Sequence, residues 1–134
     1  MFRKLVAKVR RLWEGRRTKN HVCVRGTESG IALFVNNQTI WRIAWTDIKE
    51  IFGYKDDVVT YDIICIGFRI SDEGLWCRMD EQMSGYHEVV SELERRFTLK
   101  EGWWQHVAYP AFERNFTHLW GEPFDWDKLE HGRG

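Results

Sequence analysis

The feature that most constrains the fold is a change in the spacing of the apolar residues. Up to Asp80 they mostly alternate with polar residues, as on β-strands, and from Tyr86 onward they recur at intervals of three and four, as on a helix. Turn residues such as Asn36-Asn37 divide the first part into short segments that suit hairpins. The strand-like segments predicted in this way are residues 21–26, 31–35, 39–45, 48–54, 61–70 and 75–79.

The strongest of these segments is residues 61–70. Ile64, Ile66 and Phe68 occupy one of its faces, and the first half of the other face is apolar as well. Burial on both faces is typical of a central strand. An antiparallel meander is the simplest topology for the strands around it. A single helical turn is expected just after Trp45, where the apolar spacing departs from alternation.

The helical pattern predicts one amphipathic helix over residues 84–97. Ser84 is a suitable N-cap, and the acidic residues of this segment mostly precede the basic ones, as the helix dipole prefers. One helix covering such strands predicts an α+β fold, with an antiparallel, strongly curved sheet or partial barrel capped by the helix. The apolar stripe of the helix consists of Tyr86, Val89, Val90, Leu93 and Phe97.

A basic segment precedes the strands. The first nineteen residues contain eight Lys or Arg and one acid, Glu14, whereas residues 20–134 contain twelve bases and nineteen acids. Residues 1–19 are therefore predicted to form a basic amphipathic arm, too short and too charged to span a bilayer. The arm is expected either to pack on its own domain or to bind an anionic membrane surface or phosphate groups. The anion-binding candidates are Arg3, Lys4, Lys8, Arg10, Arg11, Arg16 and Arg17.

Residues 20–134 are predicted to form a single α+β domain with a net charge of −7. Cys23, Cys65 and Cys77 form no Cys-x-x-Cys pair and lie in strand-like runs, which predicts buried thiols in a reducing, cytoplasmic compartment. A peripheral position on a membrane, held by residues 1–19, is the alternative. A protein is the expected partner of this domain, and nucleic acid is not.

The C-terminal part is rich in aromatic residues. Eight of them lie between Trp103 and Trp126, and Pro110 and Pro123 interrupt the segment. Short helical turns and extended pieces are therefore expected there. The rings either cover the sheet as part of the core or form a binding face, because Trp and Tyr are common in both places.

Asp56, Asp57 and Asp62 are brought together around one predicted turn. Clustered carboxylates can act as general acid and base or bind a cation, whereas the simpler interpretation is that Asp56 and Asp57 are turn residues. The five histidines lack the spacing of a zinc site, and the serines lack a nucleophile motif. The sequence therefore predicts no catalytic residue, metal or cofactor, and an enzyme built on the three aspartates is kept as an alternative.

The stretch Ile40–Ile51 contains the turn Trp45-Thr46-Asp47-Ile48 between two strand-like runs. It resembles the Trp-x-Asp-Ile turn of pleckstrin-homology-like (PH-like) domains in small bacterial proteins. The resemblance covers roughly residues 20–97. It implies a scaffold for binding and does not indicate any single ligand.

The same turn, together with Lys55-Asp56 and the aromatic run 103–120, also resembles small bacterial immunity proteins that neutralise a toxin. This resemblance implies a non-catalytic protein-binding domain, in particular an immunity-type inhibitor of a basic toxin or nuclease. Opposite charge would speed the encounter, and buried aromatic residues would slow release. The residues expected to bind the partner are Asp56, Asp57, Asp62, Trp104, Trp120 and Trp126.

Overall fold

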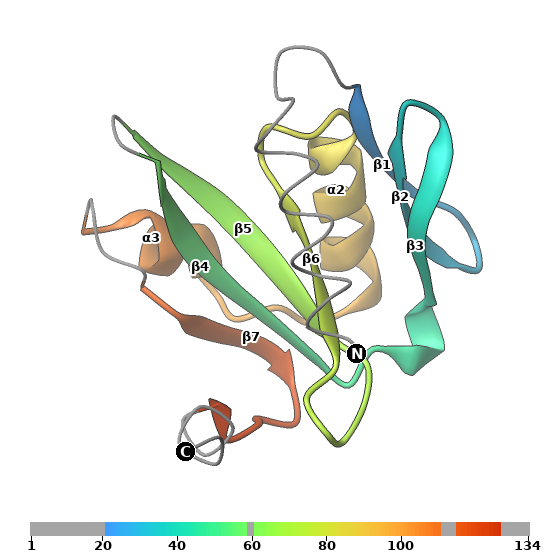
Figure 1. Cartoon of the computed structure of the whole chain (residues 1–134). Coiled ribbons are helices and arrows are strands. Elements are labelled where there is room, and N and C mark those ends of the chain that lie inside the picture. Colours follow the sequence, from blue (N-terminus) through green and yellow to red (C-terminus); the bar gives the residue numbers. More distant parts are fainter. Residues whose placement is uncertain (1–20, 59–60, 111–114, 127–134) are drawn as a thin grey trace, which may run out of the picture.

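The computed structural model of the chain describes residues 21–58, 61–110 and 115–126. The predicted basic arm, with its anion-binding candidates, lies outside these residues. The described part consists of two antiparallel sheets and a few helices, which confirms the α+β class (Figure 1). None of the helices in this part has the length and apolar character that crossing a bilayer requires.

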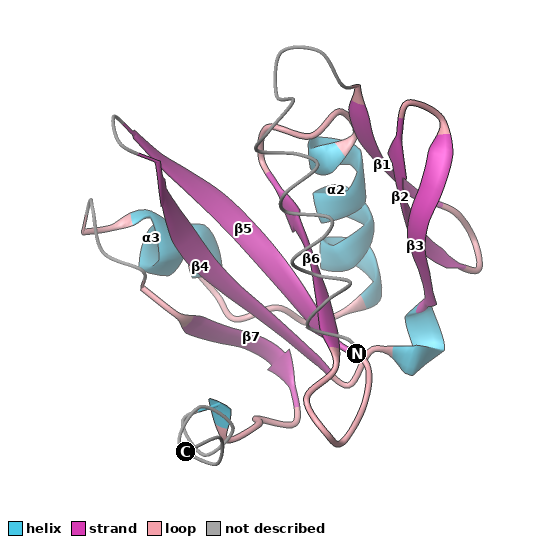
Figure 2. Cartoon of the chain, viewed as in Figure 1, coloured by secondary structure: helices cyan, strands magenta, loops and turns pink. Residues whose placement is uncertain are grey.

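The first sheet is a three-stranded meander. Its strands are β1 (Val22–Gly26), β2 (Gly30–Val35) and β3 (Gln38–Ala44), in the order β1-β2-β3 (Figure 2). Asn36 and Asn37 join β2 to β3 with φ angles of 50° and 68°. Two successive positive φ angles match the twist of an antiparallel hairpin and suit asparagine. The tight turn predicted at this pair is therefore confirmed.

The single helical turn predicted after β3 is also present. It is the 3-10 helix η1 (Trp45–Asp47). The indole Nε1 of Trp45 donates a hydrogen bond of 2.8 Å to the carbonyl oxygen of Thr27, so this turn is fastened to the loop between β1 and β2. The chain then enters the second sheet.

The second sheet has four strands in the order β6-β5-β4-β7. β5 lies between β4 and β6, which confirms that it is a central strand. The sequence indicated no strand at the position of β7, which comes after the helices and pairs with β4. The bounds of these strands are β4 (Glu50–Val58), β5 (Tyr61–Arg69), β6 (Trp76–Asp80) and β7 (Thr117–Gly121).

The predicted end of β4 at Tyr54 was wrong. The strand continues to Val58, so Lys55 and Asp56 lie within it and are buried. The interpretation of Asp56 and Asp57 as turn residues is therefore wrong, because both lie within β4. Lys55 and Asp56 each have an oppositely charged partner inside the protein, Asp62 for Lys55 and Arg78 for Asp56. Such pairing makes a buried charge tolerable.

Helix α2 (Tyr86–Arg96) follows β6 and lies between the two sheets in the view of Figure 1. Its N-cap is Gly85, with a φ of 87°, and not Ser84 as predicted. A Cβ atom on Gly85 would lie 2.0 Å from the carbonyl oxygen of Val24, so only glycine fits there. Ser84 instead accepts a backbone hydrogen bond of 2.8 Å from Val24 and donates one to Val22. This pairing attaches the start of α2 to β1.

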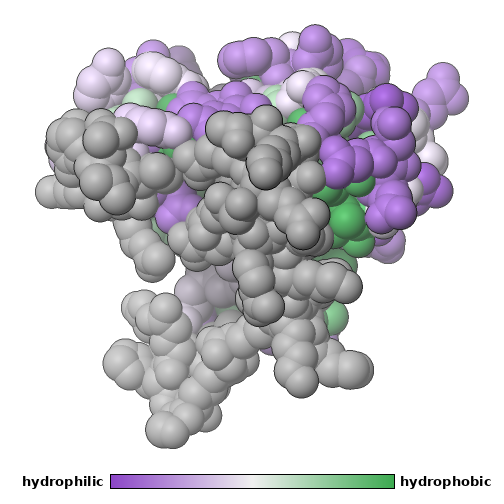
Figure 3. Space-filling model, turned by 45° about the horizontal axis from the view of Figure 1, so that its top comes forward, coloured by the Kyte–Doolittle hydropathy of each residue, from purple (hydrophilic) through white to green (hydrophobic). Residues whose placement is uncertain are grey.

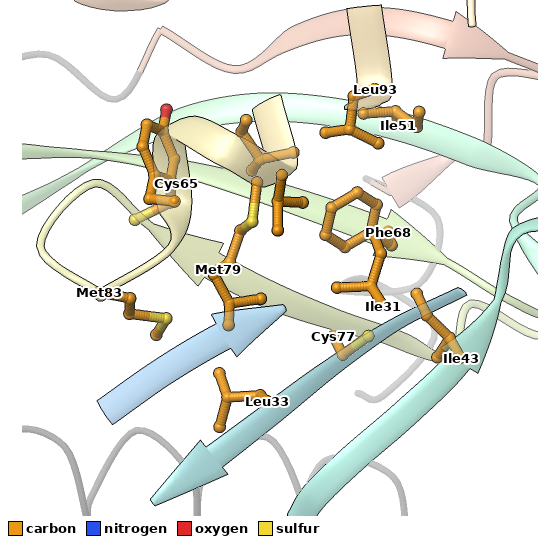
Figure 4. Packing of buried hydrophobic residues seen from close by; sticks show 14 of the residues in the cluster. Ile31, Leu33, Ile43, Ile51, Cys65, Phe68, Cys77, Met79, Met83 and Leu93 are labelled. Atoms are coloured by element: carbon orange, nitrogen blue, oxygen red, sulfur yellow. The ribbon is translucent and has the colours of Figure 1, made fainter. Parts of the chain in front are cut away.

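The hydrophobic core lies between the inner faces of the two sheets and α2. Trp41 of β3 and Phe68 of β5 meet there, with ring centroids 6.5 Å apart. In Figure 4, Leu93 of α2 lies beside Ile51 of β4. Burying each such side chain stabilises the fold by about 1.5–3 kcal/mol. The core residues labelled in Figure 4 also include Ile31, Leu33, Ile43, Cys65, Cys77, Met79 and Met83.

Helix α3 (Trp103–Ala108) and the cis peptide bond between Tyr109 and Pro110 lead to β7. In this aromatic segment, for which short helical turns and extended pieces were predicted, the described residues form one short helix and one strand. The two sheets remain open in the part of the chain that the structure describes, so the PH-like barrel stays a prediction.

Candidate binding site

One face of the second sheet packs on the hydrophobic core. The residues that alternate with the core residues along each strand form the other face, called the outer face below. Strand register places charged residues at both ends of this outer face and aromatic residues between them. The residues of the outer face include Glu50, Phe52, Tyr54, Asp56, Gly67, Arg69, Trp76, Arg78, Asp80 and His118, together with Cys65 and Ile63, which are buried and also belong to the core cluster.

The first charged group on the outer face is centred on Glu50, which is almost completely buried. Arg69 Nε donates to Glu50 Oε1 at 3.2 Å, and His118 Nδ1 lies 3.0 Å from Glu50 Oε2. The other two guanidinium nitrogens of Arg69 donate to the carbonyl oxygens of Ser71 and Glu122, each at 2.7 Å. The group therefore fastens β4 and β5 to the segments that follow β5 and β7, and each of the three guanidinium nitrogens of Arg69 is engaged within the protein.

The second charged group is centred on Arg78. Its guanidinium donates to Asp56 Oδ2 at 2.9 Å and to Asp80 Oδ2 at 3.2 Å. Burial favours the neutral form of Arg78, but the surrounding Tyr54, Cys65 and carboxylates outweigh it and raise the pKa of the guanidinium above its usual range. Burial likewise raises the pKa of Tyr54 well above 10.0. At neutral pH the arginine is charged and the phenol is neutral, which suits a structural cluster.

Phe52 occupies the middle of the outer face. A Cβ atom on Gly67 would lie 2.2 Å from the edge of the Phe52 ring, so the ring lies directly on the glycine. Phe116 stacks on Phe52 with centroids 4.9 Å apart, and Trp126 approaches it at 5.0 Å. Part of the C-terminal aromatic segment is therefore packed on the sheet, as the core interpretation predicted.

The thiols of the second sheet are not nucleophiles. Burial raises the pKa of Cys65 to about 12 and that of Cys77 still further above its usual value. A thiol with such a pKa is protonated at neutral pH, and only the thiolate attacks. Both side chains are also buried, Cys65 completely, so neither thiol is presented to solvent.

Lys55 lies on the core side of β4 and is only 2 % exposed. Its Nζ donates to the carbonyl oxygen of Ala108 at 2.8 Å and to that of Pro110, and it lies 3.3 Å from Asp62 Oδ2. Asn115 Nδ2 donates to the same Pro110 carbonyl at 2.9 Å. We call this arrangement the lysine clamp. It fixes the backbone on both sides of Tyr109.

The side chain of Tyr109 is 65 % exposed and contacts Trp104 of α3, which is 44 % exposed. The two rings form an edge-to-face pair with centroids 6.1 Å apart. Beneath them Trp103 is buried, and Val107 packs so closely on Gly53 that a Cβ there would lie 2.7 Å from it. Trp104 and Tyr109 are called the aromatic platform below. It combines two large exposed rings with an anchored backbone.

The structure places the six predicted partner-binding residues in different settings. Asp56 and Asp62 form the ion pairs described above, and the backbone of Asp57 lies opposite Asp62 in the register of β4 and β5. Trp104 is exposed, whereas Trp120 packs on Phe97 at 4.6 Å and Trp126 packs on Phe52. Of the six, Trp104 belongs to the platform, and Asp62 is linked to it through Lys55.

Sequence reasoning missed the roles of Lys55 and Tyr109. A signal for Lys55 was available, because Ile51, Gly53 and Lys55 alternate along β4 and therefore share the face that holds the core. No comparable signal marked Tyr109, since eight rings of similar character lie between Trp103 and Trp126.

Within the described residues, no group of three or more His, Cys, Asp or Glu side chains is arranged to hold a metal ion. No protein-family model matches the chain, and no curated protein or solved structure matches it. The geometry of the site is thus the basis for inferring a function.

Proposed function

We propose that this chain is a non-catalytic protein-binding domain that contacts its partner through the aromatic platform of Trp104 and Tyr109. The observation that supports this is the exposure of two large rings on a backbone anchored by the lysine clamp. Trp and Tyr supply much of the binding energy in protein interfaces. A backbone that is already ordered loses little entropy when the partner binds.

The lysine clamp itself favours a functional role for the platform. Removing an ammonium group from water is costly unless it is fully paired. Lys55 is paired with Asp62 and two carbonyl oxygens, and these contacts fix the segment from Ala108 to Pro110. The contacts of this buried ammonium group therefore stabilise the conformation that exposes Tyr109. An apolar residue at position 55 would be the simpler way to fill the core.

The chemistry of the buried polar groups favours binding over catalysis. Asp56 and Asp62, which an enzyme of this type would need, are engaged in ion pairs with Arg78 and Lys55. Cys65 has a strongly raised pKa. These groups stabilise the fold, and none of the three presents a reactive atom at neutral pH.

The charge of the domain indicates a basic partner. The described residues contain sixteen acids and nine bases, which gives a net charge of −7. Figure 3 shows that the described surface visible in that view is largely hydrophilic. The net negative charge of the domain would attract a basic protein, and the aromatic contact would hold it. An immunity-type inhibitor of a basic toxin or nuclease, on a PH-like scaffold, is the more specific form of this proposal.

The proposal is tested with three baits in host lysate: the unchanged protein, the double variant W104A/Y109A and the matched control L75A. Leu75 is also an exposed apolar residue, but it lies in the turn before β6. The expected result is a basic protein that the unchanged bait and L75A retain equally and that W104A/Y109A loses by about a hundredfold, as for two interface hot spots. The purified partner should bind the unchanged protein and L75A with equal affinity and W104A/Y109A about a hundredfold more weakly. Equal retention by all three baits, or no specific partner, would exclude the platform as the binding site.

A further inference from the structure

The basic residues of the described chain fall into two classes. Six of the nine form ion pairs with carboxylates, whereas Arg25, Arg42 and Lys100 form none with any described residue. A protein with sixteen described acids has enough carboxylates to pair all nine bases. The lack of a partner at these three positions therefore needs an explanation, and two of the three lie together.

Arg25 and Arg42 lie on the same face of the first sheet, the face opposite the core. Strand register pairs Arg25 with Ala32 and Ala32 with Arg42, so the alanine lies directly between the two arginines. Neighbouring strands are about 4.8 Å apart, which places the two Cα atoms about 10 Å from each other. Each guanidinium can reach about half of that distance, so both can contact one anion above Ala32. Arg25, Ala32 and Arg42 are called the arginine face.

Among the residues that the structure describes, no carboxylate pairs with the arginine face. The three strands of the first sheet contain no Asp or Glu. Arg25 instead lies over the ring of Phe34, with its guanidinium carbon 5.2 Å from the ring centroid. That contact orients the guanidinium without neutralising it. Two like charges held across one alanine repel each other in the free protein, and an anion placed between them would relieve the repulsion.

We propose that the arginine face binds an acidic, extended segment of a second protein partner. The face is one side of an open three-stranded sheet, which can receive side chains from a neighbouring chain. β3 is an edge strand of the described sheet, with backbone pairing to β2 on one side only. A segment added along β3 would form backbone hydrogen bonds and bring its carboxylates beside Arg42, with Arg25 two strands further across the same face.

An acidic protein segment fits this surface better than a nucleic acid does. A long polyanion needs a track of several basic residues, and the described residues have a net charge of −7. A short acidic segment meets only the two arginines and the strand edge. This surface lies on the other sheet from the aromatic platform and attracts the opposite charge, so the inference is independent of the proposed function.

The test measures fluorescence anisotropy of a labelled octapeptide of alternating Thr and Glu, with a Thr and Gln octapeptide as the neutral control. The unchanged protein should bind the acidic peptide, and R25Q/R42Q should reduce the affinity by at least about tenfold, as expected for charge-assisted contacts. The matched control K100Q removes the third unpaired base and should change the affinity by less than about twofold. The platform variant W104A/Y109A should bind like the unchanged protein.

A second pair of variants separates recognition from general charge. A32E supplies an internal carboxylate between the two arginines and should abolish peptide binding, whereas A32Q, of the same size, should retain most of it. Circular dichroism confirms that each variant is folded. Three results would overturn the proposal: no binding by the unchanged protein, an equal loss with K100Q, or stronger Arg25- and Arg42-dependent binding of an oligothymidylate.

Discussion

The two sheets differ in the burial and ion pairing of their cationic residues. In the second sheet Lys55, Arg69 and Arg78 are buried, and each is paired with a carboxylate. In the first sheet Arg25 and Arg42 are exposed and make no ion pair with any residue in the described ranges. The buried charges of the second sheet therefore stabilise the fold, whereas the exposed arginines of the first sheet are accessible to another molecule.

The pairing in the second sheet also explains how a strand as polar as β4 is buried. Glu50 and Asp56 lie on its outer face, Lys55 on its core side, and each is matched by a charge from another element. Removing one member of such a pair is costly because the other loses its compensation. Substitutions in the two sheets should therefore differ sharply in their effect on the free energy of unfolding.

The largest effect is expected for R78M. The variant removes the guanidinium that donates hydrogen bonds to the carboxylates of Asp56 and Asp80, and both carboxylates are buried. The free energy of unfolding should fall by about 3–5 kcal/mol, as for other broken buried pairs. Urea denaturation measures it. R42M makes the same chemical change in the first sheet and should stay within about 0.5 kcal/mol of the unchanged protein. Similar losses in both variants would refute the comparison.

K55M should have the next largest effect, a loss of about 2–3 kcal/mol, because the carbonyls of Ala108 and Pro110 lose a charged donor. It should also loosen the platform. Hydrogen exchange at the Tyr109 amide, which donates to the Gln105 carbonyl, should quicken more than exchange in α2.

The control for the clamp is K49M. Lys49 pairs with Asp72 at 3.4 Å, but both side chains are exposed, so the loss should be at most about 0.5 kcal/mol. If K55M were as mild as K49M, the clamp would not stabilise the platform segment.

The first sheet, the central strand β5 and helix α2 could be predicted because their signals are local. Alternation of apolar residues marks the strands, Asn36-Asn37 marks a turn, and the spacing from Tyr86 marks the helix. The N-cap was misplaced because a tertiary contact decides it. Gly85 is required by the carbonyl of Val24, which lies far away in the sequence.

The second half of β4 and all of β7 could not be predicted, because distant partners determine them. The charged residues Lys55 and Asp56 suggest that the strand ends at Tyr54, and only their distant partners Asp62 and Arg78 explain why it continues. β7 pairs with β4, and His118 within it contacts Glu50, a residue 68 positions earlier. Neither contact leaves a local trace in the sequence.

The candidate site was predictable only in part. Trp104 was a candidate because of its type, but so were Trp120 and Trp126, and the packing on Phe97 and Phe52 separates them from it. That packing depends on where β7 joins the sheet. The division of the aromatic rings between core and surface is thus a property of the tertiary fold and not of local spacing.

Replacing Gly67 by alanine should cost about 1–3 kcal/mol, as overpacking does, because its Cβ would lie 2.2 Å from the Phe52 ring. The matched variant G26A in the first sheet meets nothing closer than 3.6 Å and should change stability by less than about 0.5 kcal/mol. Thermal unfolding of both variants measures the difference. A harmless G67A would mean that Phe52 moves freely away from the sheet.

A smaller effect concerns pH. The pKa of Cys65 is raised from 9.0 to about 12 by burial, so the folded protein keeps a proton that the unfolded chain releases above pH 9. The stabilisation is complete below that pH and is lost as the pH rises toward about 12. Between pH 8 and pH 10 the free energy of unfolding should therefore fall by about 1 kcal/mol more in the unchanged protein than in C65A. Equal slopes would show that the thiol is solvated in the folded state.

The smallest effect is expected for R25Q/R42Q, and its direction is informative. Because neither arginine forms an ion pair with a residue of the described ranges, the two substitutions remove repulsion between like charges and the contact of Arg25 with Phe34. These terms oppose each other, so stability in low salt should change by less than about 0.5 kcal/mol. A slight gain that vanishes at high salt would identify the repulsion, since screening removes it. A loss above 1 kcal/mol would show that the arginines stabilise the first sheet, and the contrast between the sheets would then disappear.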